Sequence, residues 1–167
     1  DIVYSGVGKS REDIRAALRA DIGCFNVESI PELDRINEVA LEEKRMAPVS
    51  VRVNPDVDAK THPYISTGLK NNKFGVSYDQ TVALYQHAAT LPGIRISGID
   101  MHIGSQITEL EPFVHAADKI FDIVDALAQN GIMLDHLDFG GGLGVRYTDE
   151  TPPSAETLVK AVSRKAA

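Results

Sequence analysis

The chain has 167 residues, of which 43% are hydrophobic and 25% charged, and these values are typical of one globular domain with its own core. Its net charge of −7 argues against a nucleic-acid-binding surface, which needs clustered lysines and arginines. No apolar run approaches the roughly 20 residues that span a bilayer. The single cysteine, Cys24, cannot form an intrachain disulfide and fits a reducing, cytoplasmic compartment.

Short β-branched or apolar runs predict five strands, and a helical pattern follows each of them. The expected strands are residues 2–5, 24–27, 49–53, 96–103 and 136–139. Four helices are expected to begin at a serine cap, at Ser10, Ser29, Ser77 and Ser154. In the second helix, Glu32 predicts a capping box with the serine, and Leu41 belongs to the expected buried stripe. The fourth helix is expected from about Pro112 to Asn130, with Gly131 as its stop.

This alternation predicts an α/β fold with a parallel sheet and right-handed crossovers. A doubly wound sheet and a (β/α)8 barrel both satisfy it. Five strand–helix units fill the chain, whereas a complete barrel takes about 250 residues. On the barrel interpretation, residues 1–167 form a single partial barrel domain. Because the first residues already have the pattern of a strand, we expect further chain to precede them.

The opening sequence "SGVGKS" (5–10) has the order of residues that ends a nucleotide-binding loop. Such a loop needs G-x-x-x-x-G-K-[ST], because the first glycine lets the backbone wrap the phosphates. The position of that glycine is occupied by Val3. The sequence therefore predicts a strand-to-helix turn here rather than a nucleotide site.

A second glycine-rich sequence, "DFGGGLG" (138–144), follows the last expected strand. It does not match the dinucleotide fingerprint G-x-G-x-x-G, because Val145 or Tyr147 stands where the last glycine belongs. Consecutive glycines are costly in chain entropy unless the backbone needs unusual angles or a close approach. Exposed amides at the end of a strand can bind an anion. We therefore interpret Gly141 and Gly142 as part of a phosphate site, with a plain tight turn as the alternative.

The sequence "DMHIGSQ" (100–106) places His102 at the end of a strand and Ser105 in the turn that follows. Taken alone, His102 is best explained as a histidine hydrogen-bonded at a strand terminus. Beside a second glycine-rich strand end, the two residues fit a planar phosphorylated ligand. The imidazole is flat enough to stack on an aromatic ring, and the hydroxyl can donate to a phosphate.

The sequence "VRVNPDVDAKTHPYISTGLKNNKFG" (51–75) begins with Arg52 in an otherwise apolar strand, where a buried charge needs a partner. The polar loop behind it is long for a connection between a strand and a helix, and such loops are often functional. His62 and Lys73 are candidates for ligand contacts, with a solvated loop as the alternative. The remaining histidines do not have the spacing of metal ligands, so no metal site is expected.

Five sequences together resemble those of diaminopimelate decarboxylases, pyridoxal phosphate-dependent enzymes that make lysine. These sequences are "YSGVGKSREDIRAAL", "FNVES", "RVNPDVDAKTHPYISTGLKNNKFG", "DMHIGSQI" and "LDFGGGLGVRY". They occur in the right order and are spread along residues 4–147, which is most of the chain. The resemblance implies an alanine-racemase-like (β/α)8 TIM barrel, of which this chain holds roughly strands three to seven. In the family, a β-rich domain follows the barrel and the enzyme is a homodimer.

The resemblance assigns pyridoxal 5'-phosphate to five residues, Arg52, His102, Ser105, Gly141 and Gly142. His102 would stack on the pyridine ring and is also the catalytic candidate. Arg52 would lie near the phenolic oxygen of the ring, and the turns would hold the phosphate. The segment around Lys73 resembles one that approaches the partner subunit in the family.

Three features of the family have no counterpart in this sequence. They are the upstream strand with the Schiff-base lysine, the downstream strand whose acid bonds the pyridine nitrogen, and the C-terminal β domain. We therefore expect an internal fragment that does not decarboxylate alone. The expected function of the complete enzyme is decarboxylation of meso-diaminopimelate, a small amino acid, to lysine. The alternatives are an arginine, ornithine or carboxynorspermidine decarboxylase, a non-catalytic homologue that binds the cofactor, and an open-sheet phosphate-binding protein.

Overall fold

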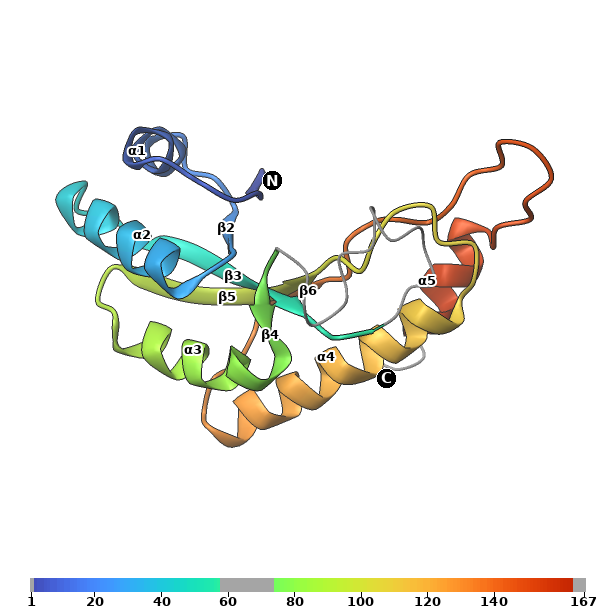
Figure 1. Cartoon of the computed structure of the whole chain (residues 1–167). Helices are drawn as coiled ribbons and strands as arrows, with labels where there is room; N and C mark the ends of the chain where they lie inside the picture. Colours follow the sequence, from blue (N-terminus) through green and yellow to red (C-terminus); the bar gives the residue numbers. More distant parts are fainter. Residues whose placement is uncertain (1, 58–73, 164–167) are drawn as a thin grey trace.

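The computed structural model describes residues 2–57 and 74–163. Within these residues, a parallel sheet has six strands: β1 (Val3–Tyr4), β2 (Cys24–Val27), β3 (Ala47–Asn54), β4 (Val76–Ser77), β5 (Ile94–Met101) and β6 (His136–Asp138). Five strands are neighbours in the order β1-β2-β3-β5-β6, and β4 pairs with the end of β3 (Figure 1). Sequential strands that lie side by side and parallel require helical crossovers between them.

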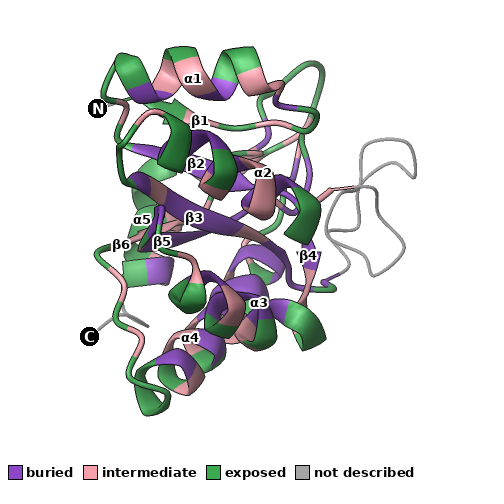
Figure 2. Cartoon of the chain, turned by 90° about the vertical axis from the view of Figure 1, so that its left-hand side faces the viewer, coloured by how far each residue is buried: buried purple, intermediate pink, exposed green. Residues whose placement is uncertain are grey.

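The helices are α1 (Arg11–Arg19), α2 (Ile30–Glu42), α3 (Tyr78–Thr90), α4 (Glu111–Gln129) and α5 (Ala155–Ser163). Helices α1 to α4 form an arc over one face of the sheet, as Figure 2 shows. The sheet curls away from them, and α5 packs against α4 beyond the carboxyl ends of the strands (Figure 1). A curled parallel sheet with its helices on the outer face is part of a (β/α)8 barrel. The predicted partial barrel is therefore confirmed, and the doubly wound sheet is excluded.

The hydrophobic core lies between the outer face of the sheet and the arc of helices. Alternate residues of β2 and β3 point into it, because side chains of a strand alternate between the two faces. Its fully buried members include Phe25, Val27, Val49, Val51, Leu33, Ile36, Leu84 and Ile99. The residues between these core positions point to the inner face of the sheet, and most of them are polar.

A β-bulge at Ser97 interrupts the pairing of β3 with β5. The Ser97 hydroxyl donates to a backbone oxygen of β3 at 3.0 Å, and the buried hydroxyl of Tyr85, from α3, donates to the Gly98 oxygen at 2.6 Å. Such a bulge changes which residues face one another across a strand pair. Past the bulge, Arg52 pairs with Asp100, so both side chains belong to the inner face.

The expected strands and helices agree with the structure apart from shifts of a residue or two at their ends. The exception is β4, which the sequence did not predict because it has two residues and leads directly into α3. The cap of α3 is a second difference. Ser77 is the N-cap residue, as the sequence predicts, but its side chain makes no capping hydrogen bond. The residue is also the last of β4, where it pairs with Asn54.

The predicted capping box in α2 is wrong. The Ser29 hydroxyl accepts from the Glu32 amide at 3.4 Å, but the Glu32 carboxylate turns to buried Lys9 instead of the Ser29 backbone. The prediction that Leu41 is buried is also wrong, because 48% of its surface is exposed. The buried face of α2 is carried by Val39 and Ala40, and the next position points about 100° away from Ala40.

Candidate functional site

A cavity of about 250 Å³ lies at the carboxyl ends of the strands. Its lining comes from strands that are far apart in the sequence, because parallel strands end at the same edge of the sheet. The lining residues are Ser5, Arg52, Asp100, His102, Asp138 and Gly140. Two of the predicted site residues, Arg52 and His102, therefore face one cavity.

Arg52 has the charged partner that its position in an apolar strand required. Its guanidinium Nη1 donates to Glu28 Oε1 at 2.8 Å, and the two side chains are 15% and 3% exposed. On the inner face, Arg52 is in register with Asp100 of β5, which is in register with Asp138 of β6. A positive charge and three carboxyl groups therefore meet beside the cavity.

Asp100 is 5% exposed. Burial and the neighbouring Asp138 carboxylate raise its pKa to about 7, although Arg52 opposes the shift. Removing a carboxylate from water disfavours its charged form, and a second negative charge adds to that cost. Asp100 therefore holds a proton over much of the range below neutral pH.

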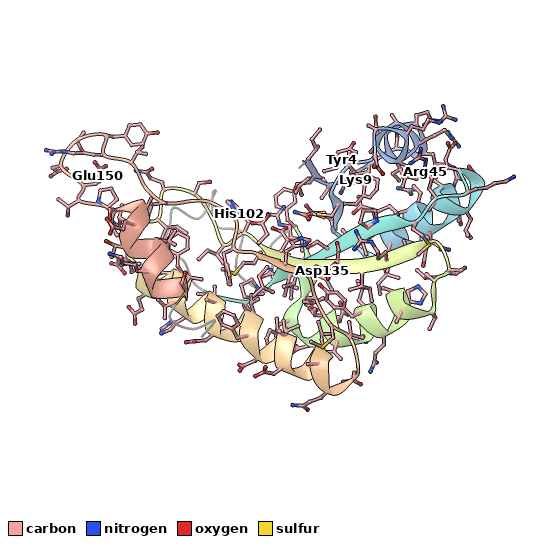
Figure 3. The ribbon with its side chains drawn as sticks, turned by 180° about the vertical axis from the view of Figure 1, so that it is seen from behind. Tyr4, Lys9, Arg45, His102, Asp135 and Glu150 are labelled. Carbon is pink, nitrogen blue, oxygen red and sulfur yellow. The ribbon has the colours of Figure 1, made fainter. Side chains whose placement is uncertain are left out.

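His102 follows β5 and lies at the middle of the molecule, past the end of the sheet (Figure 3). Its half-buried position lowers its pKa, the Arg52 charge lowers it further, and Asp138 opposes both. The ring is therefore mostly uncharged at neutral pH. An uncharged planar ring beside a cavity is suited to stacking on another aromatic ring.

The two glycine-containing turns are joined by backbone hydrogen bonds. The Ile107 amide donates to the Gly142 oxygen at 2.9 Å, and the Gly144 amide donates to the Ile107 oxygen at 2.8 Å. The side-chain amide of Gln106 makes two further bonds, at 2.5 and 3.0 Å, with the backbone one residue beyond Gly144. These contacts bring the turn that carries Ser105 to the turn after β6.

The three consecutive glycines differ in what they do. Gly142 has a φ of 103°, and a Cβ there would overlap the Gly104 oxygen, so the close approach of the turns requires glycine. A Cβ on Gly141 would meet nothing within 4 Å. Within the described part of the chain, the amides of Gly141, Gly142 and Leu143 donate to no protein group. Consecutive amides without an acceptor among the described residues fit an anionic group such as a phosphate.

Sequence reasoning missed Glu28, Asp100, Asp138 and Gln106. Two of them had a sequence signal, because Asp100 lies two positions before His102, and Asp138 lies two positions before the first of the three glycines. The partnership of Glu28 with a residue of another strand had none. His62 and Lys73 lie outside the described residues.

Other features of the described residues bear on earlier expectations. No group of three or more histidine, cysteine, aspartate or glutamate side chains in the described ranges is arranged to hold a metal ion. Of the helices that the structure describes, none has the length and apolar character to cross a membrane. The "SGVGKS" turn encloses its lysine: Lys9 is 2% exposed and pairs with Glu32 at 3.2 Å. A lysine held in this way is not directed at a bound nucleotide.

The family model described as "Pyridoxal-dependent decarboxylase, pyridoxal binding domain" matches residues 1–167. The chain is 57% identical to the diaminopimelate decarboxylase of Haemophilus influenzae and 56% identical to that of Pseudomonas aeruginosa, each over 98% of this chain and 40% of the relative. The chain therefore spans about 40% of the length of these relatives.

Solved structures give the same family. The diaminopimelate decarboxylase of Helicobacter pylori complexed with L-lysine has a TM-score of 0.94 and 41% identity over 98% of this chain and 41% of that one. The M. jannaschii enzyme in complex with L-lysine has a TM-score of 0.90 and 39% identity over 99% of this chain and 39% of that one. The chain belongs to the pyridoxal-binding domain family of the pyridoxal-dependent decarboxylases, whose cofactor is pyridoxal phosphate.

Proposed function

We propose that this chain is the pyridoxal phosphate-binding part of a diaminopimelate decarboxylase, which converts meso-diaminopimelate to lysine. The observation that carries the proposal is the identity to proteins of that name over nearly the whole chain. The complexes of two similar structures with L-lysine support it, because lysine is the product of that reaction.

The residues of the site fit this cofactor. Gly141, Gly142 and Ser105 would hold the phosphate, since backbone hydrogen bonds join the two turns and nothing lies within 4 Å of a Cβ placed on Gly141. His102 would cover one face of the pyridine ring. Arg52 would lie near the phenolic oxygen, where its positive charge favours the ionised form of that oxygen. When bound, the cofactor supplies an electron sink for the negative charge left as carbon dioxide departs.

The chain's own charges prepare the site for this role. Glu28 holds Arg52 at 2.8 Å, so the guanidinium keeps its direction before any ligand binds. His102, with its lowered pKa, offers an uncharged ring. Asp100, with a pKa of about 7, can hold a proton beside the cavity. A site whose dipoles and charges are fixed in advance needs little reorganisation during the reaction.

We further propose that the Schiff-base lysine comes from outside this chain. Among the described lysines, Lys9 is buried against Glu32, Lys119 donates to the Pro55 oxygen at 2.7 Å, and Lys160 pairs with Glu156 at 2.5 Å. Lys44 lies in the turn between α2 and the start of β3, at the end of that strand opposite the site. Four other lysines, Lys60, Lys70, Lys73 and Lys165, lie outside the described residues. The complete enzyme is proposed to be a cytoplasmic homodimer with additional strands and a C-terminal β domain.

The test uses the complete protein that contains this chain, loaded with pyridoxal phosphate. Carbon dioxide release is measured with meso-diaminopimelate, ornithine, arginine and carboxynorspermidine, each against a cofactor-only blank. The proposal expects release from meso-diaminopimelate, with L-lysine as the second product. A preference for another substrate would favour a related decarboxylase, and no release from any of the four would favour a non-catalytic homologue.

A further inference from the structure

A chain of four paired charges leads from the first turn of the molecule to the cavity; three of them are buried, and Arg52 is partly exposed. It begins at Lys9, whose side chain is 1% exposed. The ammonium donates to the Gly6 oxygen at 2.5 Å, the Asn26 oxygen at 2.8 Å and Glu32 Oε1 at 3.2 Å. All three of its protons have acceptors, so this lysine is fixed in place.

The next member, Glu32, links this lysine to the end of β2. Its Oε1 accepts from Lys9, and its Oε2 accepts from the backbone amide of Glu28 at 2.7 Å. The carboxylate is therefore divided between a charge and a backbone group. Because the amide belongs to Glu28, the position of Glu32 decides where the Glu28 backbone lies.

Glu28 repeats this division at the cavity. Its side chain is 3% exposed, its Oε1 accepts from Arg52 at 2.8 Å, and its Oε2 accepts from the Gly75 amide at 2.9 Å. Position 75 requires glycine, because its φ is 79° and a Cβ there would lie 2.8 Å from the backbone oxygen of Arg52. One carboxylate thus joins the ends of β2 and β3 to the start of β4.

The four charges balance, since Lys9 and Arg52 are positive and Glu28 and Glu32 are negative. Buried charges are tolerated when each is paired and its remaining bonds are satisfied. Arg52 also has a competing acceptor, because Asp100 is its register partner on the neighbouring strand. The guanidinium donates to Glu28 Oε1 at 2.8 Å, and the raised pKa of Asp100 has its largest cause in the burial of that carboxyl group.

We propose that Glu28 is a positioning residue, which directs the guanidinium of Arg52 at the cofactor and is itself held by the Glu32–Lys9 pair. The role of Arg52 toward the cofactor rests on the proposed function. Glu28 thereby sets the direction of the Arg52 side chain, and Lys9 of the "SGVGKS" turn has the structural role of holding Glu32.

The test is a double-mutant cycle in the complete protein, with cofactor affinity measured by absorbance titration. Glu28→Gln and Arg52→Met should each weaken pyridoxal phosphate binding roughly tenfold, as expected for losing a hydrogen bond to a charged group. The double variant should be no weaker than either single variant, because both changes remove one function. Glu42→Gln, which removes a charge from exposed surface ion pairs, should bind as the unchanged protein does.

Two further readouts separate positioning from a general loss of structure. The absorption band of the bound cofactor should shift in the same direction in Glu28→Gln and Arg52→Met, and not in Glu42→Gln. Glu28→Asp keeps the charge and should recover part of the affinity even if Glu28→Gln folds poorly. Losses that multiply in the double variant, or unchanged affinity in both Glu28 variants, would overturn the proposal. Failure to decarboxylate diaminopimelate would contradict the proposed function and leave this cycle interpretable.

Discussion

Asp100 should make the chain less stable as the pH rises from about 4 to about 7, and Asp100→Asn should remove that loss. The carboxyl has a pKa of about 7 in the folded chain against an ordinary value of 3.8. Well below pH 3.8 the group is protonated in both states and contributes nothing. Between these values only the unfolded chain loses the proton, so the folded state becomes less favourable as pH rises. Above pH 8 the penalty is complete.

The size of the penalty follows from the two pKa values. At 1.36 kcal/mol for each pH unit, the difference between 3.8 and about 7 corresponds to about 4 kcal/mol of unfolding free energy. Asparagine has nearly the same shape and cannot ionise. The advantage of Asp100→Asn over the unchanged chain should therefore grow by about 3 kcal/mol between pH 5 and pH 8.

The assay is urea unfolding of both chains at pH 5, 6, 7 and 8, followed by circular dichroism. The control is Asp135→Asn, which removes a carboxylate with 70% of its side chain exposed and a surface partner, Arg95. Its difference from the unchanged chain should vary little with pH. A constant or shrinking advantage for Asp100→Asn would refute the reasoning, because it would mean that the folded chain does not retain the proton.

Three other changes test the turns and the ring. Gly142→Ala should lower the unfolding free energy by about 2 kcal/mol or more, because alanine disfavours the left-handed φ and its Cβ would overlap the Gly104 oxygen. In the same urea assay, Gly141→Ala should change the unfolding free energy by less than about 1 kcal/mol. Equal effects of the two changes would contradict the assigned contacts. Lys9→Met should cost about 3 kcal/mol or more in that assay, because it leaves the Glu32 carboxylate buried without its partner, and a neutral result would show that the pair is dispensable. In the complete protein, replacing His102 by Ala should weaken cofactor binding roughly tenfold and slow turnover, whereas replacement by Phe should keep most of the affinity; full affinity without a ring would exclude stacking.

The strand–helix alternation, the partial barrel and the position of two glycine-rich turns at one edge could all be predicted from the sequence. The alternation and the turns depend on local patterns, such as apolar runs, serine caps and glycines after strands, whereas the choice of a barrel over a doubly wound sheet rests on the resemblance to the decarboxylases. His102 and Gly142 are examples, because His102 directly follows β5 and Gly142 lies in the turn that follows β6. In a parallel sheet that position alone decides the edge at which a residue lies.

The charges of the site could not be predicted in this way. The pairing of Arg52 with Glu28 depends on which strands are neighbours and on the division of one carboxylate between two donors. The facing of Asp100 and Arg52 depends on the bulge at Ser97, which shifts the register by one residue. The capping box at Glu32 failed for a similar reason, since its two carboxylate oxygens accept from buried Lys9 and from the Glu28 amide, and the local sequence pattern predicts neither contact.

The most direct test of the account is a crystal structure of the complete protein with pyridoxal phosphate bound. The account predicts the phosphate within hydrogen-bonding distance of the amides of Gly141 and Gly142 and of the Ser105 hydroxyl, with the His102 ring parallel to the pyridine ring and Arg52 still paired with Glu28. A cofactor bound away from the carboxyl ends of β5 and β6, or one whose ring does not contact His102, would contradict it.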